Sequence, residues 1–275
     1  EMLFLDYLNE WVQVHKASIQ PATFISYNRM ITGRITQYFE PLGLKLCEVT
    51  PQVLDEFQEK ILLEGYTTNT VIHYHAIFGK AFKDAVRKDY LETNPMLKVD
   101  RPKKNSFRPN FYSKDEVQQL LEVSQDAPLH LCILITAYYG LRRSEVMGLR
   151  WDAVDFVHNT ICIRHTVTGC TIDGQYQIIA ADTTKTRSSR RTLPLVPTVR
   201  EMLLRLKEQQ EQNRKICGQS YSREFADYIC VNKLGERIRP AYLSSCFSKA
   251  LEQNHLRHIR FHDLRHSCAT LLLAH

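Results

Sequence analysis

RHIRFHDLRHSCATLLLAH, residues 257–275, is the stretch that decides the fold of the second half of the chain. Apolar side chains recur in it at helical spacing: Phe261, Leu264, Cys268 (or Ala269), Leu271 and Leu272. His262 and Arg265 lie three residues apart on another face of the same helix, so both side chains can reach one target. The planar fork of donors on an arginine matches phosphate or carboxylate oxygens, and phosphate is the preferred ligand here.

Two alternatives remain for this stretch. The run H-D-L-R-H places His262 and His266 four residues apart, as in a zinc-dependent hydrolase, with Asp263 where such an enzyme carries a glutamate base. A metal site is disfavoured, because Asp263 is one methylene shorter than glutamate and Arg265 puts a fixed positive charge beside the cation. The other alternative is a helix whose polar face only meets solvent.

Length and composition place the chain among globular proteins. Its 275 residues suffice for two domains, 44% of them are hydrophobic, and no run approaches the ~18 apolar residues that a membrane span needs. The acidic start lacks an export signal. The eight cysteines form no C-x-x-C pair, which argues against a zinc site or a disulfide framework and favours the cytoplasm.

Charge is distributed unevenly along the chain, whose formal net charge is +6. Residues 1–100 carry 10 Lys and Arg against 13 Asp and Glu, whereas residues 101–275 carry 26 against 17. A basic second part indicates a polyanionic partner.

The first hundred residues predict a small helical bundle. Helical periodicity covers residues 2–14, 21–39, 51–65 and 68–90. The solvent-facing side of the last helix carries a short basic ridge, made of His73, Lys80, Lys83 and Arg87. Such a ridge either tracks a phosphate backbone or is merely solvated.

Residues 100–112 predict an extended, exposed connector, because the prolines and charged residues concentrated there cannot build a core. Its basic residues Arg101, Lys103 and Lys104 can follow a phosphate backbone while joining two domains.

A second domain is expected from Ser113, where S-K-D-E forms a capping box. The apolar run 129–139 predicts a buried helix that stops at Gly140. Arg142 follows this stop, and Glu145 lies one turn further on, close enough to orient a guanidinium. A surface Arg–Glu pair of little energetic value is the alternative.

Residues 161–167, 176–180 and 191–195 predict three short strands in one small sheet. Between the last two strands lies a segment rich in cations and hydroxyl residues, with Lys185, Arg187, Arg190 and Arg191 as candidate phosphate contacts. Lys185 could donate a proton to a leaving oxygen or be an ordinary solvated lysine. Helices are expected again at 197–215 and 241–254.

Three separated clusters, G-L-R-R-S-E, T-K-T-R-S-S-R-R-T-L-P-L and F-H-D-L-R-H, together resemble the tyrosine recombinases of the phage integrase family. The run H-D-L-R-H-S-C-A-T looks most like integrases of conjugative transposons. The resemblance implies a mainly α fold with a small antiparallel β-sheet. It also implies a core-binding helical domain at 1–99, a basic linker at 100–112 and a catalytic domain at 113–275, which form a C-shaped clamp on duplex DNA.

Roles follow from the resemblance residue by residue. Arg142 and Arg265 would hold the scissile phosphate, His262 would hydrogen-bond it, Lys185 would protonate the leaving 5′-oxygen, and Glu145 would support the site. The family uses neither a metal nor a cofactor, since the guanidiniums neutralise the phosphate and a 3′-phosphotyrosine bond conserves the energy of the cleaved strand.

The family's nucleophilic tyrosine follows the second arginine, but no tyrosine follows Tyr242 in this sequence. The nucleophile is therefore expected beyond residue 275, and the 275 residues alone are expected to be inactive. The expected function is site-specific integration and excision of a mobile element, with a DNA-binding relative that does not cleave as the alternative. Expected partners are duplex DNA in the bacterial nucleoid, further copies of the chain as a dimer or tetramer, and an accessory excision factor.

Overall fold

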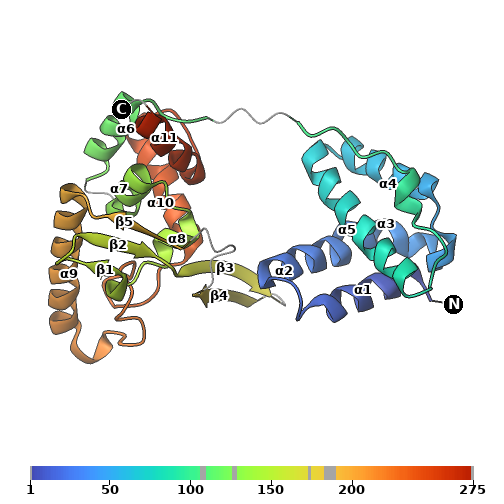
Figure 1. Ribbon diagram of the computed structural model, residues 1–275, viewed down its shortest axis with the longest axis horizontal. Coiled ribbons are helices and arrows are strands. Elements are labelled where there is room, and N and C mark those ends of the chain that lie inside the picture. Colours follow the sequence, from blue (N-terminus) through green and yellow to red (C-terminus); the bar gives the residue numbers. More distant parts are fainter. Residues whose placement is uncertain (1, 106–109, 126–128, 173–174, 183–189, 274–275) are drawn as a thin grey trace. The chain divides into compact units, whose positions relative to one another are not determined.

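The computed structural model describes residues 2–105, 110–125, 129–172, 175–182 and 190–273 (Figure 1). The chain divides into two compact units, Glu1–Phe107 and Arg108–His275, and each has its own hydrophobic core. Within the described residues, no helix combines the length and apolar character required to cross a membrane. The predicted fold class, mainly α with small antiparallel β structure, is confirmed.

The first unit is helical. Its helices are α1 (Phe4–His15), α2 (Pro21–Met30), α3 (Thr36–Phe39), α4 (Pro51–Leu63) and α5 (Thr68–Arg87). Aromatic rings fill the core, with Phe4 stacked on Phe82 at 5.4 Å between centroids and Phe57 edge-on to Phe78 at 5.4 Å. The inner face of α5 consists of apolar residues at helical spacing, all of them buried: Val71, Tyr74, Phe78, Ala81, Phe82 and Ala85. Because this face packs on the core, the opposite, polar side of α5 faces solvent.

The continuous helix predicted over residues 21–39 is interrupted. A π-helical turn, Ile31–Ile35, separates α2 from α3, and Gly33 within it has non-helical dihedral angles, φ −95° and ψ −110°. Ile31 and Ile35, at the two ends of this turn, are both fully buried, so the distorted segment still packs on the core of the first unit. Thr36 stabilises the distortion by donating its hydroxyl to the Ile31 carbonyl at 2.7 Å.

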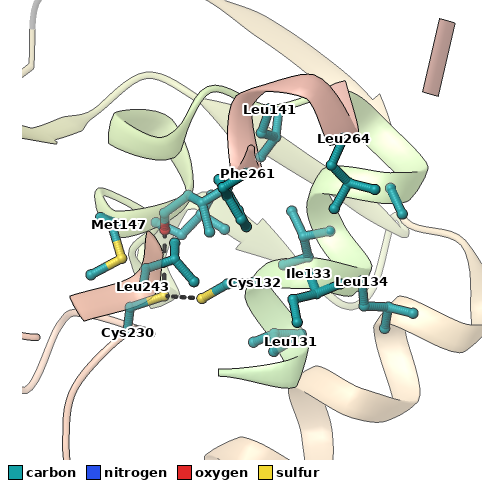
Figure 2. Close-up of a cluster of buried hydrophobic side chains, with 14 of the residues drawn as sticks. Leu131, Cys132, Ile133, Leu134, Leu141, Met147, Cys230, Leu243, Phe261 and Leu264 are labelled. Carbon is teal, nitrogen blue, oxygen red and sulfur yellow. Dashed lines mark hydrogen bonds between the residues drawn. The ribbon is translucent and has the colours of Figure 1, made fainter. Parts of the chain in front are cut away.

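The second unit is built around α7 (His130–Tyr139), which packs against α6 (Lys114–Val123), α8 (Arg143–Met147), α9 (Pro197–Cys217) and α11 (Phe261–Leu273). The predicted capping box at Ser113 is present, and α7 ends at Gly140, whose φ of 60° suits glycine. Figure 2 shows residues of α7 in this core. The sulfur atoms of Cys132 and Cys230 lie 3.5 Å apart there. Helix α10 (Pro240–Gln253) completes the unit.

Two small antiparallel sheets replace the single sheet that was expected. Strands β1 (Val154–Asp155), β2 (Thr160–Ile163) and β5 (Arg191–Pro194) pair in the order β1-β2-β5. Strands β3 (Thr166–Ile172) and β4 (Gln175–Ala181) form a separate pair. The prediction of one strand over residues 161–167 was wrong, because the chain leaves one sheet at Ile163 and enters the other at Thr166, where the His165 side chain turns into the protein.

Candidate active site

Glu145 is the buried centre of the candidate active site. It lies in α8, its side chain is 1% exposed, and it accepts hydrogen bonds from the backbone N–H of Arg142 at 2.8 Å and from the Arg142 guanidinium at 2.8 Å. The R-x-x-E pair therefore fixes the start of α8 and orients Arg142, which keeps half of its side chain exposed. The alternative of a solvent-exposed Arg–Glu pair that contributes little to stability is therefore wrong, because Glu145 is buried.

A second guanidinium binds the same carboxylate. Arg191, in β5, donates to the two oxygens of Glu145 at 3.3 and 3.0 Å. Burial acts to raise the pKa of Glu145, but the hydrogen bonds from Arg191 and Arg142 outweigh it and hold this pKa below its usual range. The sequence placed Arg191 among DNA contacts, whereas the structure places its guanidinium on Glu145, 46 residues earlier.

Helix α11 presents His262 and Arg265 as expected. Phe261, Leu264 and Cys268 are buried and fix the orientation of the helix. Asp263 accepts from the backbone N–H of Arg260 at 3.0 Å and from its guanidinium at 2.7 and 2.9 Å, and these bonds lower the pKa of Asp263. The aspartate of H-D-L-R-H therefore holds the start of α11, and its carboxylate is occupied by Arg260.

Arg265 lies near the Glu145 cluster. A Cβ built on Gly140 with ideal geometry would lie 3.6 Å from the Arg265 carbonyl oxygen. Helix α11 therefore packs closely against Gly140, which precedes Arg142 by two residues. Burial lowers the pKa of Arg265, as do the positive charges of Arg142 and Arg191, while Glu145 acts in the opposite direction. Its Nη1 is buried and has no hydrogen-bond partner within the described residues. An anionic oxygen would satisfy this donor.

His262 is exposed beside this cluster. Its ring lies edge-on to that of His266, with 5.5 Å between centroids. Burial of part of the ring lowers the pKa of His262, and the charges of His266 and Arg265 lower it further. The imidazole is thus neutral at pH 7 and retains one N–H to donate. No group of three His, Cys, Asp or Glu side chains in the described segments is arranged to hold a metal ion.

The remaining predicted contacts fall into three groups. Lys185 and Arg187 lie outside the described residues. Arg190 is exposed and donates to the Asp182 carbonyl at 3.3 Å. All the predicted contacts of the first unit and connector are exposed, namely His73, Lys80, Lys83, Arg87, Arg101, Lys103 and Lys104.

Sequence reasoning missed a buried histidine. His165 is 8% exposed and forms hydrogen bonds with Asp182 and Tyr228. Only the interruption of apolar alternation at Arg164–His165 signals this position in the sequence.

Comparison with known proteins identifies the family. Residues 110–275 match the phage integrase family, and residues 3–101 match the phage integrase SAM-like domain. The chain belongs to the phage integrase family. This phage integrase family member is 25% identical over 283 residues to the "Tyrosine recombinase XerC-like" protein of Caldanaerobacter subterraneus subsp. tengcongensis, covering 97% of this chain and 71% of the relative. It is also 25% identical over 256 residues to the ICEBs1 integrase of Bacillus subtilis, covering 92% of this chain and 67% of that integrase.

Solved structures share the fold of this phage integrase family member. The integrase of transposon Tn1549 in complex with a circular intermediate DNA superposes with a TM-score of 0.79 at 17% identity, over 100% of this chain and 87% of the integrase. A lambda integrase dimer bound to a COC′ core site superposes with a TM-score of 0.74 at 16% identity, over 98% and 89% of the two chains. The predicted resemblance to the integrases of mobile elements is thereby confirmed.

Proposed function

We propose that this phage integrase family member is a site-specific DNA recombinase that excises and integrates a mobile element. Three findings support this function: the match to the phage integrase family, the similarity to the ICEBs1 integrase, and the structural similarity to the Tn1549 integrase. The observation that carries the proposal is the cation cluster around Glu145. Arg142 and Arg191 bind this buried carboxylate, and beside them Arg265 presents a buried donor that has no partner among the described residues.

The cluster suits a phosphodiester transition state. Arg142 and Arg265 hold the non-bridging oxygens, where negative charge is spread in the transition state, and each such donor is worth ~2.7–4 kcal/mol. Glu145 orients Arg142, and its negative charge partly offsets the repulsion between the guanidiniums. His262 donates the N–H of its neutral imidazole to the same phosphate.

Strand cleavage exchanges one ester for another. A tyrosine oxygen attacks the phosphorus as its proton is removed, and the bond to the 5′-oxygen breaks with its electron pair staying on that oxygen. The Lys185 ammonium gives the proton that makes this oxygen a hydroxyl. The product is a 3′-phosphotyrosine, and attack by a 5′-hydroxyl of another strand reverses the same steps.

The nucleophile in this proposal is a tyrosine outside residues 1–275, because no tyrosine follows Tyr242 in the sequence. Residues 1–275 by themselves then bind DNA without cleaving it. Binding uses the exposed basic residues of α5, the connector and Arg190. Self-association on DNA belongs to the proposal because lambda integrase forms a dimer on its core site, and an accessory excision factor would set the direction.

The test is covalent capture of DNA by the natural polypeptide that contains residues 1–275. A duplex nicked beside the cleavage site loses a short fragment after cleavage, so the protein–DNA ester accumulates and is detected on a denaturing gel. We expect an adduct from that polypeptide, none from residues 1–275, and a loss of about 100-fold or more in rate for Arg142→Ala with DNA binding retained.

Arg142→Lys is the matched variant in this test. It keeps the positive charge but loses the planar fork, so it should cleave almost as poorly as Arg142→Ala. Tight binding without any adduct from the natural polypeptide would instead identify a relative that occupies DNA without cutting it.

A further inference from the structure

Tyr112 connects the start of the second unit to helix α11 and to the segment that leads into it. Its side chain is 1% exposed. Its hydroxyl donates a hydrogen bond to the Arg257 carbonyl, and its backbone N–H donates to the Ser267 hydroxyl oxygen at 2.9 Å. Residues 257 and 267 flank His262 and Arg265 in the sequence. One buried residue thus holds the chain before and after both candidate phosphate ligands.

Ser267 has a fixed orientation in the core. It is fully buried, and its hydroxyl donates to the Asp263 carbonyl at 3.3 Å, one turn earlier in α11. Because a hydroxyl has a single proton, its oxygen is left to accept, and the N–H of Tyr112 occupies it. The Asp263 carboxylate in turn accepts from Arg260. Directional bonds therefore hold the first turns of α11.

Arg257 attaches the segment before α11 to helix α6. Its guanidinium donates to the Glu116 carboxylate from Nε at 3.0 Å and from Nη2 at 2.9 Å, and Nη2 also donates to the Phe111 carbonyl at 2.9 Å. The guanidinium lies over the ring of Tyr112, 5.0 Å from its centroid. Glu116 also belongs to the capping box of α6, where it accepts from the Ser113 N–H at 2.7 Å. Tyr112 and Arg257 therefore hold one another at two points beside the start of α6.

The bond between Tyr112 and Ser267 sets the rotation of α11 about its axis. Ser267 follows Arg265 by two residues, which places the two side chains about 200° apart around the helix. The apolar contacts of Phe261 and Leu264 are non-directional, whereas a hydrogen bond requires a particular direction. A rotation of about 10° moves a group ~6 Å from the helix axis by about 1 Å. Loss of the bond on one face of α11 should therefore displace Arg265 on the opposite face.

Arg265 depends on the helix for its position. Its Nη1 is buried and has no hydrogen-bond partner in the described part of the chain. The positive charges of Arg142 and Arg191 act against its guanidinium, and Glu145 acts in its favour. These opposing charges do not hold the side chain in one place, so its location follows the backbone of α11.

We propose that Tyr112 is a positioning residue for Arg265, and that it acts through Ser267 and Arg257 to place this guanidinium against the scissile phosphate. The inference rests on the proposed function, in which Arg265 holds a non-bridging oxygen of that phosphate. Tyr112 is buried and does not itself contact the DNA. It acts by fixing α11, and a displacement of about 1 Å at a catalytic group costs on the order of 100-fold in rate.

The test removes the charge that Arg265 neutralises. A duplex with a methylphosphonate at the cleavage site carries an uncharged methyl group in place of one non-bridging oxygen. Its transition state carries less negative charge, so a cationic donor contributes less to its rate of cleavage. A variant with a displaced Arg265 should be slow on the phosphate duplex but should cleave the methylphosphonate duplex at nearly the rate of the unmodified polypeptide. A variant with a damaged fold should be slow on both.

Three variants of the natural polypeptide are compared on both duplexes. Tyr112→Phe keeps the ring and loses the hydrogen bond to the Arg257 carbonyl. Ser267→Ala leaves the Tyr112 N–H without its acceptor. Arg265→Ala removes the guanidinium itself and serves as the reference. Single-turnover cleavage at saturating DNA measures the chemical step, and fluorescence anisotropy measures the dissociation constant for DNA.

Two control variants match these changes outside α11. Tyr7→Phe removes an equivalent bond in the first unit, where the buried Tyr7 hydroxyl donates to the Ala81 carbonyl at 2.6 Å. Ser245→Ala removes an exposed hydroxyl that donates one turn back along α10, to the Ala241 carbonyl at 3.3 Å. Both controls should cleave each duplex at the rate of the unmodified polypeptide.

We expect Tyr112→Phe and Ser267→Ala to lose about 10- to 100-fold in cleavage of the phosphate duplex, with an unchanged dissociation constant, and to recover on the methylphosphonate duplex as Arg265→Ala does. Equal losses on both duplexes, or no loss on the phosphate duplex, would overturn the positioning role, while recovery of Arg265→Ala would keep the role of Arg265 intact. Failure of Arg265→Ala to recover would overturn that role and the inference with it. Absence of cleavage by the unmodified polypeptide would refute the recombinase function itself.

Discussion

The guanidinium of Arg191 lies 3.0 Å from the carboxylate of Glu145, which joins strand β5 to helix α8 across 46 residues of sequence. Glu145 is 1% exposed, and Arg142 occupies the same carboxylate. The carboxylate therefore serves the structure of the unit and the orientation of a candidate catalytic arginine at once. Loss of this charge should be measurable both as instability and as lost cleavage.

Glu145→Gln should lower the free energy of unfolding of the second unit by ~1–3 kcal/mol, because two guanidiniums lose their charged, buried acceptor. Urea denaturation measures this in a Trp11→Phe background, where Trp151 is the remaining tryptophan. Glu211→Gln removes the exposed pair with Arg214 and should change stability by less than ~0.5 kcal/mol. Equal stability of the two variants would contradict a structural role for Glu145.

The stability conferred by Glu145 should depend on pH. Its folded pKa lies below the unfolded value of about 4.3, so its contribution is present above that pH and is lost as pH falls through the folded pKa. The difference in unfolding free energy between the unmodified chain and Glu145→Gln should therefore shrink from pH 6 toward pH 3. A difference that stays constant over this range would show that the carboxylate is not held ionised by its arginines.

Gly148→Ala and Gly79→Ala should change stability in opposite directions. The new methyl group at residue 148 meets the His165 carbonyl oxygen and should cost ~1–3 kcal/mol. At residue 79, within α5, no atom of the described part of the chain lies within 4 Å of the position a Cβ would take, so alanine should stabilise the first unit by ~0.5–1 kcal/mol. Urea denaturation followed by circular dichroism measures both, and a tolerated Gly148→Ala would contradict the close packing of α8 on β3.

His266→Ala should raise the pKa of His262, because it removes one of the groups that disfavour the imidazolium. The pKa of His262 in the unmodified chain should lie below the usual value of about 6.5, which leaves the ring neutral at pH 7. Proton NMR of the imidazole resonances during a pH titration measures it. His255→Ala alters an exposed histidine at the end of α10 and should leave the titration of His262 as it was.

Lys83→Gln should weaken the salt dependence of DNA binding more than Arg87→Gln does. Each phosphate contact contributes about −0.9 to the slope of log affinity against log salt concentration. Arg87 already binds Asp84 at 2.8 Å, and that carboxylate is held by Trp11 and His15, so Arg87 has less charge to offer. Binding measured by fluorescence anisotropy across a salt series tests the difference. Equal slopes for the two variants would show either that α5 does not contact DNA or that the ion pair with Asp84 does not reduce the contribution of Arg87.

Local patterns predicted much of the fold. The burial of Phe78 and Phe82 follows from helical periodicity, the start of α6 follows from S-K-D-E, and the end of α7 follows from Gly140, because each depends on residues within about one turn. The shared face of His262 and Arg265 was predicted for the same reason. These features are decided by neighbours in the sequence.

Other features depend on distant partners and were not predicted. The binding of Arg191 to Glu145 needs strand β5 to lie beside α8, and the burial of His165 needs Tyr228, 63 residues later. The division into two sheets falls at Arg164 and His165, between the end of β2 and the start of β3, and depends on the different strands with which β2 and β3 pair. A regular alternation of apolar residues carries no information about these partners.

The π-helical turn at Ile31–Ile35 alters how this segment should be aligned with other sequences. An α-helix advances by about 100° per residue, so one residue accommodated in a wider turn shifts the angular phase of everything before it relative to everything after it. A gapless alignment with a relative that has an ordinary helix here would equate inward positions with outward ones on one side of Gly33. Placing a one-residue gap within 31–35 restores the correspondence on both sides.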